Sequence, residues 1–326
     1  MPTPMIEIIK VDQAFRTGFW LKKAQILHQI DLQVPRGQIF GFLGANGAGK
    51  TTLIHLIAGL RKPVTGTVKI SGKDAALREA RALIGYLPER PYFHEHLTGE
   101  GMLHYFGALS GMGRPEINAR IPIVLEEVGL GENSVRAGRK MPRHLELKRY
   151  SKGMLQRIGI AQALLHDPEL LVLDEPMSGL DPIGRKEVRE LLVRLARRGK
   201  TIFFSSHVIP DVEAICTQVG LIESGKVIGC GTIAEVLSSK HISGAESSRT
   251  EVAFSGSGVD QARLLANSIP GFEFDSQIPE GYRGFVAGTA ALQPVIRALL
   301  DNRAEILWVL PVRPSLEALF QKEGRT

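Results

Sequence analysis

The sequence predicts an α/β fold with a parallel-sheet core. Three short apolar runs, at residues 39–43, 170–173 and 202–204, are typical of parallel strands that are buried on both faces. Each run is followed directly by residues that can bind or transform a polar ligand. Because open α/β sheets place their ligand-contacting residues at the carboxyl ends of the strands, these three strand ends are expected to contribute to one site.

The first run leads into a glycine-rich loop, Gly44-x-x-x-x-Gly49-Lys50-Thr51, and apolar residues then recur at helical spacing from residue 53 to residue 60. Glycines let backbone N–H groups approach an anion, and a helix that begins near Lys50 adds unpaired N–H groups and a positive dipole end. Lys50 is expected to reach the β- and γ-phosphates of a nucleotide, and the Thr51 hydroxyl to ligate Mg²⁺. An ordinary glycine-rich turn would need neither side chain at these offsets.

The second run ends in two adjacent carboxylates, Asp174 and Glu175. The pair suits a divided task, in which Asp174 holds Mg²⁺ through its water shell and Glu175 polarises the water that attacks the γ-phosphate. Both residues could instead cap the following turn. That alternative does not account for an acidic pair at the end of an apolar strand in a chain that also has a phosphate-binding loop, so Glu175 is the predicted general base or water-positioning residue.

The third run is followed by Ser205, Ser206 and His207. A single histidine is more often structural than functional. This one follows a strand end that is topologically equivalent to that of Asp174. His207 is therefore predicted to touch the γ-phosphate and to organise the attacking water.

The composition is that of a globular protein in a reducing compartment. The chain has 326 residues, enough for a nucleotide-binding core and a smaller second domain, and 44% of them are hydrophobic. Cys216 and Cys230 have no metal-like spacing and do not make a disulfide framework. The formal charge of +6 discriminates poorly between a protein with an anionic partner and a mildly basic cytosolic one.

The sequence contains no apparent targeting or membrane-spanning segment. The N-terminal stretch has no apolar core of the signal-peptide type, and no window approaches the ~20 consecutive apolar residues of a membrane helix. If the protein serves a membrane, we expect another chain to cross it.

The stretch RYSKGMLQRIGIAQALLHDP, at 149–168, completes a set of five motifs that together resemble the ATP-binding-cassette (ABC) ATPases. GANGAGKTT resembles Walker A, LLVLDE resembles Walker B with its glutamate, and YSKGMLQR resembles the signature usually written LSGGQ-x-QR. SGLD, at 178–181, is similar to the D-loop, and His207 to the switch histidine. The resemblance covers about residues 5–240, and the order and spacing of the motifs make it very specific.

The resemblance implies a P-loop NTPase fold within an ABC domain at 1–240, with an N-terminal antiparallel β subdomain and a helical subdomain at about 91–165. It also implies a head-to-tail dimer that buries two ATP molecules, each between one subunit's phosphate loop and the other's signature. Ser151 and Gly153 open a predicted helix at 154–165 and would face the γ-phosphate from its second side. The residues then expected to bind ATP are Gly44, Asn46, Gly47, Ala48, Gly49, Lys50, Thr51, Thr52, Phe15, Ser151 and Gly153, and those expected to hold Mg²⁺ are Thr51, Asp174 and Glu89.

Two motifs depart from the family's usual pattern. Lys152 replaces the first glycine of the signature and Met154 its glutamine. A lysine at a helix N-terminus is unfavourable for the dipole unless an anion lies nearby, and a γ-phosphate would be such an anion. Glu89 stands where the family usually has the Q-loop glutamine, and a carboxylate can still ligate Mg²⁺ or a water.

The aromatic residue that stacks on adenine should lie upstream of the phosphate loop. The segment at 14–27, AFRTGFWLKKAQIL, is longer than is usual there. Phe15 is the preferred residue, and Phe19 and Trp20 remain rivals.

Helix-rich patterns at 92–113 and 117–130 match the family's helical subdomain, which docks against the permease. Only this region, and no individual residue, is predicted as the contact. The basic stretch at 136–149 is interpreted as a solvated face because no aromatic residues interleave it, and no nucleic-acid partner is expected.

The last part of the chain predicts a small α+β accessory domain at 241–326. The stretch at 238–250 is interpreted as a linker. Four strands, EVAFSG, FEFDS, YRGFVAG and EILWVLPV, alternate with helical patterns at 260–268 and 290–300 in the order βαββαβ, and PSLEALFQKEG is a predicted final helix. The domain shows no catalytic constellation and is interpreted as a dimerisation or regulatory module.

IGYLPE, YSKGM and the final PSLE-x-x-F phrase are similar to cassette subunits that pair with separately encoded exporter permeases, a branch with drug-resistance, lipid, polysaccharide and gliding-motility systems. The resemblance therefore implies an ATP hydrolase that powers export through an integral membrane permease, as a homodimer at the cytoplasmic face of the membrane. The alternative is a soluble ABC-type ATPase that acts on the ribosome or on nucleic acid. Ribosome-acting members usually carry two cassettes in one chain and chromosome-type members a long coiled coil, and the sequence shows neither.

Overall fold

The computed structural model describes residues 3–17, 22–131, 135–136, 139–140, 145–239, 249–256, 260, 264, 267–311 and 316. The chain divides into two compact units, residues 1–233 and residues 234–326. Some sequence predictions fall outside the described residues: the rival aromatics Phe19 and Trp20, most of the helical pattern at 260–268, and almost all of the final helix.

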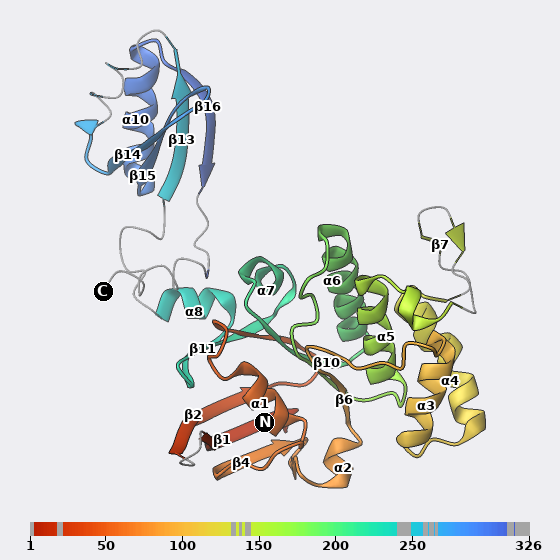
Figure 1. Ribbon diagram of the computed structural model, residues 1–326. Helices are drawn as coiled ribbons and strands as arrows, with labels where there is room; N and C mark the ends of the chain where they lie inside the picture. The colour runs from red at the N-terminus through yellow and green to blue at the C-terminus, as the bar shows by residue number, and fades with distance from the viewer. Residues whose placement is uncertain are drawn as a thin grey trace. The chain divides into compact units, whose positions relative to one another are not determined.

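A six-stranded sheet forms the core of the first unit (Figure 1). Its strand order is β12-β11-β3-β10-β9-β6. Strands β11, β3, β10, β9 and β6 run parallel to one another, and β12 is an antiparallel edge strand beside β11. The strands are β3 (Ile39–Leu43), β6 (Ile84–Leu87), β9 (Leu170–Leu173), β10 (Thr201–Ser206), β11 (Gln218–Glu223) and β12 (Lys226–Gly231). All residues of β3, β9 and β10 are buried, which explains why these strands read as continuous apolar runs in the sequence.

A second, antiparallel sheet with the order β2-β1-β4-β5 covers one side of this unit. Its strands are β1 (Ile6–Thr17), β2 (Lys22–Val34), β4 (Thr65–Ile70) and β5 (Lys73–Asp74). Helix α1 (Lys50–Ile57) packs between the two sheets, and its Leu53, Ile54 and Ile57 side chains are completely buried in the shared core. Because apolar side chains of α1 pack against both sheets, the position of the first turn of α1 is fixed relative to the carboxyl end of β3.

Three helices gather at one side of the first unit: α3 (Gly99–Leu109), α4 (Arg114–Glu127) and α5 (Lys152–Leu164) (Figure 1). The pattern at 92–113 predicted a longer first helix than the one observed. Thr98 is the N-cap of α3, and its side chain accepts a hydrogen bond from the Gly101 N–H at 3.1 Å, so the segment before it is not helical. The remaining elements of this unit are α2 (Arg78–Arg81), β7 (Val135–Arg136), β8 (Arg139–Lys140), the 3₁₀ turn Leu147–Arg149, α6 (Pro182–Arg197) and α7 (Ile209–Ile215).

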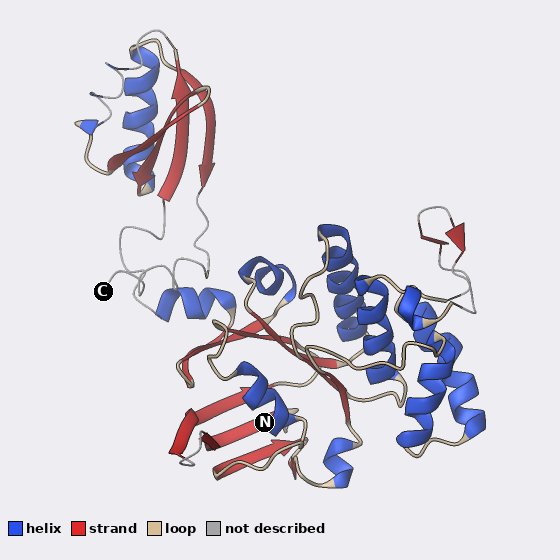
Figure 2. Ribbon diagram, in the orientation of Figure 1, coloured by secondary structure: helices blue, strands red, loops and turns tan. Residues whose placement is uncertain are grey.

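The second unit begins in α8 (Ile233–Ser239) and contains a four-stranded antiparallel sheet with the order β14-β15-β13-β16. Helix α10 packs on one face of this sheet (Figure 2), where Val252, Phe254 and Leu299 belong to a separate hydrophobic core. Its strands and helix are β13 (Arg249–Ser255), β14 (Phe272–Ile278), β15 (Gly281–Ala287), α10 (Thr289–Asp301) and β16 (Glu305–Pro311).

The predicted fold class is confirmed: an α/β unit with a parallel-sheet core, an antiparallel β subdomain and a helical subdomain, followed by a small α+β unit. Among the described residues, we find no helix that is both long enough and apolar enough to cross a bilayer. The strand ends of the six-stranded sheet are the positions that the sequence marked for function, and they lie side by side as β3, β10 and β9.

Candidate functional site

The loop between β3 and α1 depends on glycine at two positions. Gly47 has φ +81° and Gly49, the N-cap of α1, has φ +109°, both in the region that side-chain-bearing residues rarely adopt. A Cβ atom on Gly49 would also lie 2.7 Å from Cδ2 of Leu27. The loop therefore adopts its path only because these positions lack side chains.

This loop presents several unpaired N–H groups. Within the described residues, the backbone N–H groups of Asn46, Gly47, Gly49, Lys50 and Thr51 donate to no backbone or side-chain acceptor. Converging free N–H groups at a helix N-terminus form a site for an anion. The Lys50 ammonium lies inside the same loop, where it donates to the carbonyls of Gly44 at 2.8 Å and Ala45 at 3.2 Å.

A pocket of about 470 Å³ opens over the loop. This volume falls within the usual range for small-molecule sites. The pocket brings together most of the residues that the sequence marked, and it is lined by Phe15, Ile26, Asn46, Gly47, Gly49, Lys50, Thr51, Thr52, Glu89, Glu175, Ser178 and His207. Gly44, Ala48 and Asp174 are buried directly beneath the surface of the site rather than lining it.

The two carboxylates at the end of β9 have different surroundings. Glu175 adopts a left-handed backbone conformation, with φ +49°, and its side chain points into the pocket. Its Oε2 atom lies 2.9 Å from Nδ1 of His207, and its Oε1 atom lies 3.5 Å from the Lys50 ammonium. Asp174 is 1% exposed; one carboxylate oxygen accepts a hydrogen bond from Ser205, and the other has no partner among the described residues.

The charge of Asp174 acts on two aromatic neighbours. Burial, followed by the negative charge of Asp174, raises the pKa of Tyr86 to about 12. Burial lowers the pKa of His55, and Asp174 opposes that shift. The rings of His55 and Tyr86 meet edge to face, with centroids 6.4 Å apart. The region around Asp174 is therefore largely desolvated.

Phe15 and Glu89, the residues predicted to stack on adenine and to help hold Mg²⁺, both line the pocket. Phe15 is at the far end of β1, and the guanidinium carbon of Arg61 lies 4.8 Å from its ring centroid. This cation–π contact holds the phenyl ring from one side. The Glu89 side chain is about half exposed and its Oε1 lies 3.8 Å from Nε of Arg90.

The signature residues lie elsewhere on the same unit. Ser151 caps α5 and its hydroxyl accepts a hydrogen bond from the Met154 N–H at 3.3 Å. Neither Ser151 nor Gly153 lines the pocket over the phosphate loop. Lys152 lies against Gly179 of the segment 178–181, and a Cβ on Gly153 would lie 3.9 Å from Cδ2 of Leu180. The predicted signature and D-loop are thus neighbours within one chain, while the phosphate loop is separate from the signature.

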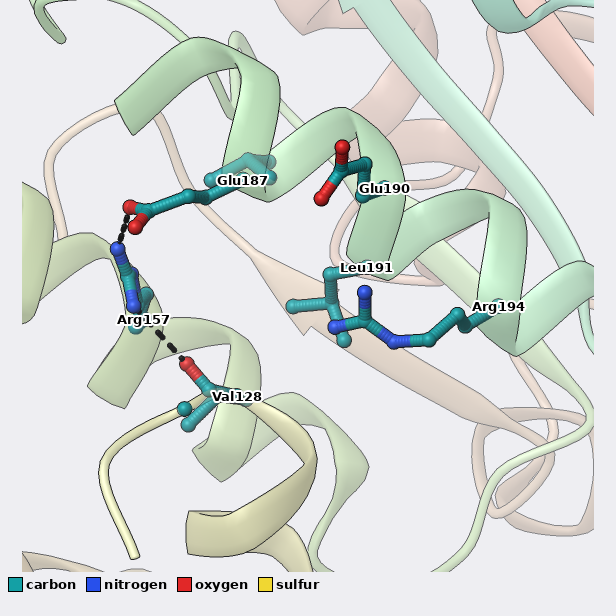
Figure 3. Close-up of a pocket in the computed structure, with 8 residues that line it drawn as sticks. Val128, Arg157, Glu187, Glu190, Leu191 and Arg194 are labelled. Carbon is teal, nitrogen blue, oxygen red and sulfur yellow. Dashed lines mark hydrogen bonds and ion pairs between the residues drawn. The ribbon is translucent and has the colours of Figure 1, made fainter. Parts of the chain in front are cut away.

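A second, smaller pocket lies between α5, the segment after α4, and α6 (Figure 3). Its volume is about 110 Å³. Figure 3 shows Glu187 reaching from α6 to Arg157 of α5, and the Arg157 Nη1 atom also donates to the Val128 carbonyl at 3.5 Å. The pocket is small and its central charges form an ion pair, so we assign it to packing between helices.

The sequence analysis assigned no individual role to two residues that line the main pocket, Ile26 and Ser178, or to Arg61, which lies over the Phe15 ring. Ser178 is part of a recognised motif, but its approach to the phosphate loop depends on the turn after Glu175, where its N–H donates to the Glu175 carbonyl at 3.0 Å. Ile26 and Arg61 come from β2 and from the segment after α1. No sequence signal marks them, because their positions depend on how the two sheets pack.

Comparison with known proteins agrees with this geometry. The family model described as ABC transporter matches residues 27–178. An uncharacterised ABC transporter ATP-binding protein of Synechocystis sp. is 38% identical over 98% of this chain and 85% of that protein. A bacitracin transport ATP-binding protein of Bacillus licheniformis is 43% identical over 61% of this chain and 62% of that protein. The structure of a dimeric bacterial ABC transporter cassette, 22% identical, superposes with a TM-score of 0.61 over 70% of this chain and 99% of that chain, which supports the fold.

Proposed function

The chain belongs to the ATP-binding proteins of ABC transporters, and from that premise we propose that it powers export through a separately encoded membrane permease. ATP binding and hydrolysis are the activities of this family's ATPase domain. The direction of transport, the separate permease and the sharing of ATP between two subunits are our proposal. The observation that carries the sharing of ATP is one pocket that gathers Lys50, Thr51 and Glu175 with His207, while Ser151 and Gly153 lie outside that pocket. Export and the separate permease are inferred from the resemblance of the sequence motifs to that branch of the family.

We propose that the phosphate loop binds the triphosphate of ATP. The free N–H groups of the loop would donate hydrogen bonds to phosphate oxygens, and the Lys50 ammonium would exchange its contacts with loop carbonyls for contacts with the β- and γ-phosphates. Phe15 would stack on adenine with the ring face that Arg61 leaves free.

The residues also fit a bound Mg²⁺. Asp174 has one buried carboxylate oxygen without a hydrogen-bond partner, and Thr51 and Glu89 present oxygen atoms at the pocket. Mg²⁺ usually keeps several waters and phosphate oxygens as ligands, so a bound ion would need only one or two of these protein oxygens. When bound, Mg²⁺ would neutralise charge on the phosphates.

For hydrolysis, we propose that Glu175 orients and polarises the attacking water. Its carboxylate is held from two sides, by His207 at Oε2 and by Lys50 at Oε1. His207 is about two-fifths exposed, so its ring can also reach a γ-phosphate in the pocket. A held carboxylate reduces the reorganisation needed when the water attacks.

The position of the signature supports a shared site. In this chain Ser151 and Gly153 lie at the N-terminal end of α5 and do not line the pocket over the phosphate loop. Two chains arranged head to tail would bring the α5 end of each to the pocket of the other. The hydroxyl of Ser151 and the N–H groups of the first turn would then face the γ-phosphate.

We propose that the permease contacts the helical subdomain. Four rings form a chain of edge-to-face contacts there: Tyr92 with His94 at 5.8 Å, His94 with Tyr105 at 5.3 Å, and Tyr105 with Phe106 at 5.7 Å between centroids. Tyr92 is 81% exposed and Tyr105 44%. Exposed aromatic side chains are typical of the centre of a protein interface. They follow Glu89, which lines the ATP pocket, so the same segment would connect the pocket to the membrane partner.

Residues 241–326 would serve as a dimerisation or regulatory module.

The experiment is purification of the protein from native membranes. We expect a chain with several membrane-spanning segments to co-purify, and ATP hydrolysis by the pair to exceed that of the isolated subunit. The double variant Tyr92→Ala, Tyr105→Ala should recover much less of that chain. Ile183→Ala on α6, where the side chain is 65% exposed, is the matched control and should recover the normal amount. Loss of recovery in both variants, or the absence of any membrane chain, would contradict the proposal.

A further inference from the structure

The Ser205 hydroxyl joins the two carboxylate residues of the site. Ser205 lies near the end of β10 and is completely buried. Its Oγ atom accepts a hydrogen bond from the Glu175 N–H at 2.9 Å and donates one to Oδ1 of Asp174 at 2.6 Å. The neighbouring strands β9 and β10 pair in parallel register up to Leu173 and Phe204, which places Ser205 beside Asp174.

The contact with Glu175 acts on the backbone. Glu175 has φ +49°, a conformation that is unfavourable for a residue with a side chain. The hydrogen bond from its N–H to Ser205 anchors the chain at the residue where this turn begins. The Glu175 side chain then reaches the pocket, where it contacts His207 and Lys50.

The contact with Asp174 acts on the carboxylate. The Ser205 O–H occupies Oδ1, and Oδ2 remains buried without a hydrogen-bond partner among the described residues. A carboxylate with one oxygen fixed has a defined orientation for the other. Removal of the hydroxyl would leave two buried polar groups, Oδ1 of Asp174 and the N–H of Glu175, without this partner.

We propose that Ser205 is a positioning residue that sets the orientation of Asp174 toward Mg²⁺ and of Glu175 toward the attacking water. This inference rests on the proposed function of the pocket. Ser205 is completely buried and does not line the pocket, so it would act only through these two residues.

The next residue provides a matched control. Ser206 is also buried, at 3% exposure, and it also lies in β10. Its hydroxyl accepts a hydrogen bond from the Val208 N–H at 3.0 Å and forms no hydrogen bond with either carboxylate. Removal of the Ser206 hydroxyl removes a buried hydrogen bond at the same strand end but leaves the hydrogen bonds of Ser205 with Asp174 and Glu175 intact.

The experiment compares Ser205→Ala, Ser205→Thr and Ser206→Ala with the wild-type protein. The first measurement is the affinity for ADP with Mg²⁺ and with EDTA, and the second is the affinity of the ADP complex for Mn²⁺ by electron paramagnetic resonance. Turnover with saturating ATP is the third. We expect Ser205→Ala to lower the Mn²⁺ affinity and kcat by roughly 10- to 100-fold, the usual effect of losing a residue that orients a metal ligand. Its ADP affinity in EDTA should stay within about twofold of the wild-type value. Ser205→Thr should restore both quantities, and Ser206→Ala should leave the Mn²⁺ affinity unchanged.

If Ser205→Ala does not fold, Ser205→Cys keeps a side chain of similar size with a weak donor and should give an intermediate loss. Wild-type Mn²⁺ affinity and kcat in Ser205→Ala, or an equal loss of Mn²⁺ affinity in Ser206→Ala, would overturn the inference while the proposed function stands. A wild-type protein that neither binds nor hydrolyses ATP would instead overturn the proposed function itself.

Discussion

The Nδ1 atom of His207 lies 2.9 Å from the Oε2 atom of Glu175, so the residue at the end of β10 holds the residue at the end of β9. The contact joins two strand ends that are 32 residues apart in the sequence. Glu175 is therefore held in place by the sheet, and its side chain is only 10% exposed. A group in this setting is suited to orienting a water rather than to making a solvated ion pair.

Replacement of the carboxylate by an amide tests that role. Glu175→Gln should still bind ATP, because Lys50 and the loop N–H groups remain in place, but should turn over roughly 10²–10⁴-fold more slowly. Single-turnover hydrolysis with radiolabelled ATP measures the step directly. Hydrolysis at a near-normal rate would remove Glu175 from the mechanism.

Removal of the loop cation tests phosphate binding. Lys50→Ala should weaken ATP binding by roughly 10- to 100-fold, because a positive charge that would face two phosphates is lost without replacement. Calorimetric titration gives the affinity, and Lys73→Ala, an exposed lysine on β5, is the control. Unchanged affinity in a folded Lys50→Ala protein would contradict the phosphate-loop assignment.

The adenine contact can be separated from the phosphate contact. Phe15→Ala should lose about 1–3 kcal/mol of ATP binding, the usual range for removing a stacked ring, while Phe15→Tyr should keep it. Affinity for inorganic tripolyphosphate should not change in either variant, because this ligand has no base. An equal loss for ATP and tripolyphosphate would mean that Phe15 supports the fold of the pocket rather than adenine.

Complementation between two damaged chains tests the shared site. Lys50→Ala disables the phosphate loop, and Ser151→Arg blocks the signature by bulk and by a positive charge at a helix N-terminus. In a mixed dimer, one site carries both lesions and the other pairs an intact loop with an intact signature. ATP hydrolysis should partly recover on mixing, with subunit exchange confirmed by differently tagged chains.

If each chain completed its own site, mixing would restore nothing. A cooperative requirement for two intact sites would give the same result. ATP-dependent dimerisation of Glu175→Gln, measured by light scattering, separates these explanations, since it requires shared sites but not hydrolysis.

The stability of the fold should fall between neutral and mildly acidic pH. Burial lowers the pKa of His166, whose Nε2 atom lies 3.1 Å from the Ile84 carbonyl, and burial also lowers the pKa of His55. As the pH falls through about 6.5, these histidines take up protons more readily in the unfolded chain than in the folded one. The free energy of unfolding that they contribute is therefore fully present above that pH and decreases as the pH falls.

The measurement is the melting temperature between pH 8 and pH 5. His166→Gln keeps a donor for the Ile84 carbonyl and cannot titrate, so its melting temperature should fall less steeply than that of the wild type. His104→Gln, on the exposed side of α3, is the control and should follow the wild-type curve. An unchanged slope in His166→Gln would assign the pH dependence to other groups.

The sequence predicted three of the six strands in the parallel-sheet core, β3, β9 and β10, and with them the residues at their ends, whereas β6, β11 and β12 were not predicted. A parallel strand buried on both faces needs a continuous apolar run, so β3, β9 and β10 could be recognised without neighbours. The first helix of the helical subdomain was less well predicted. Apolar and aromatic residues at 92–97 fit a helical period, but Thr98 caps the helix, so α3 begins at Gly99, about two turns later than the pattern at 92–113 suggested.

Side-chain contacts between elements that are distant in the chain could not be predicted from the sequence. Nothing in the order of residues indicates that Arg61 covers Phe15, because β1 and the end of α1 meet only through packing of α1 between the sheets. The role of Ser205 was equally hidden. Two adjacent serines look alike in the sequence, and only the pairing of β10 with β9 distinguishes the one that meets Asp174 and Glu175.

The ion pair between Arg157 and Glu187 has a mechanical consequence. Arg157 is the sixth residue of α5 and Glu187 the sixth of α6, so the two helices are joined at equal distances from their first residues (Figure 3). Lys152, the first residue of α5, also lies against Gly179 in the segment that leads into α6. Helices α5 and α6 would therefore move together as one rigid body. Withdrawal of the α5 tip from a partner subunit would withdraw the segment 178–181 in the same movement, so these two parts of a subunit contact would separate cooperatively rather than one after the other.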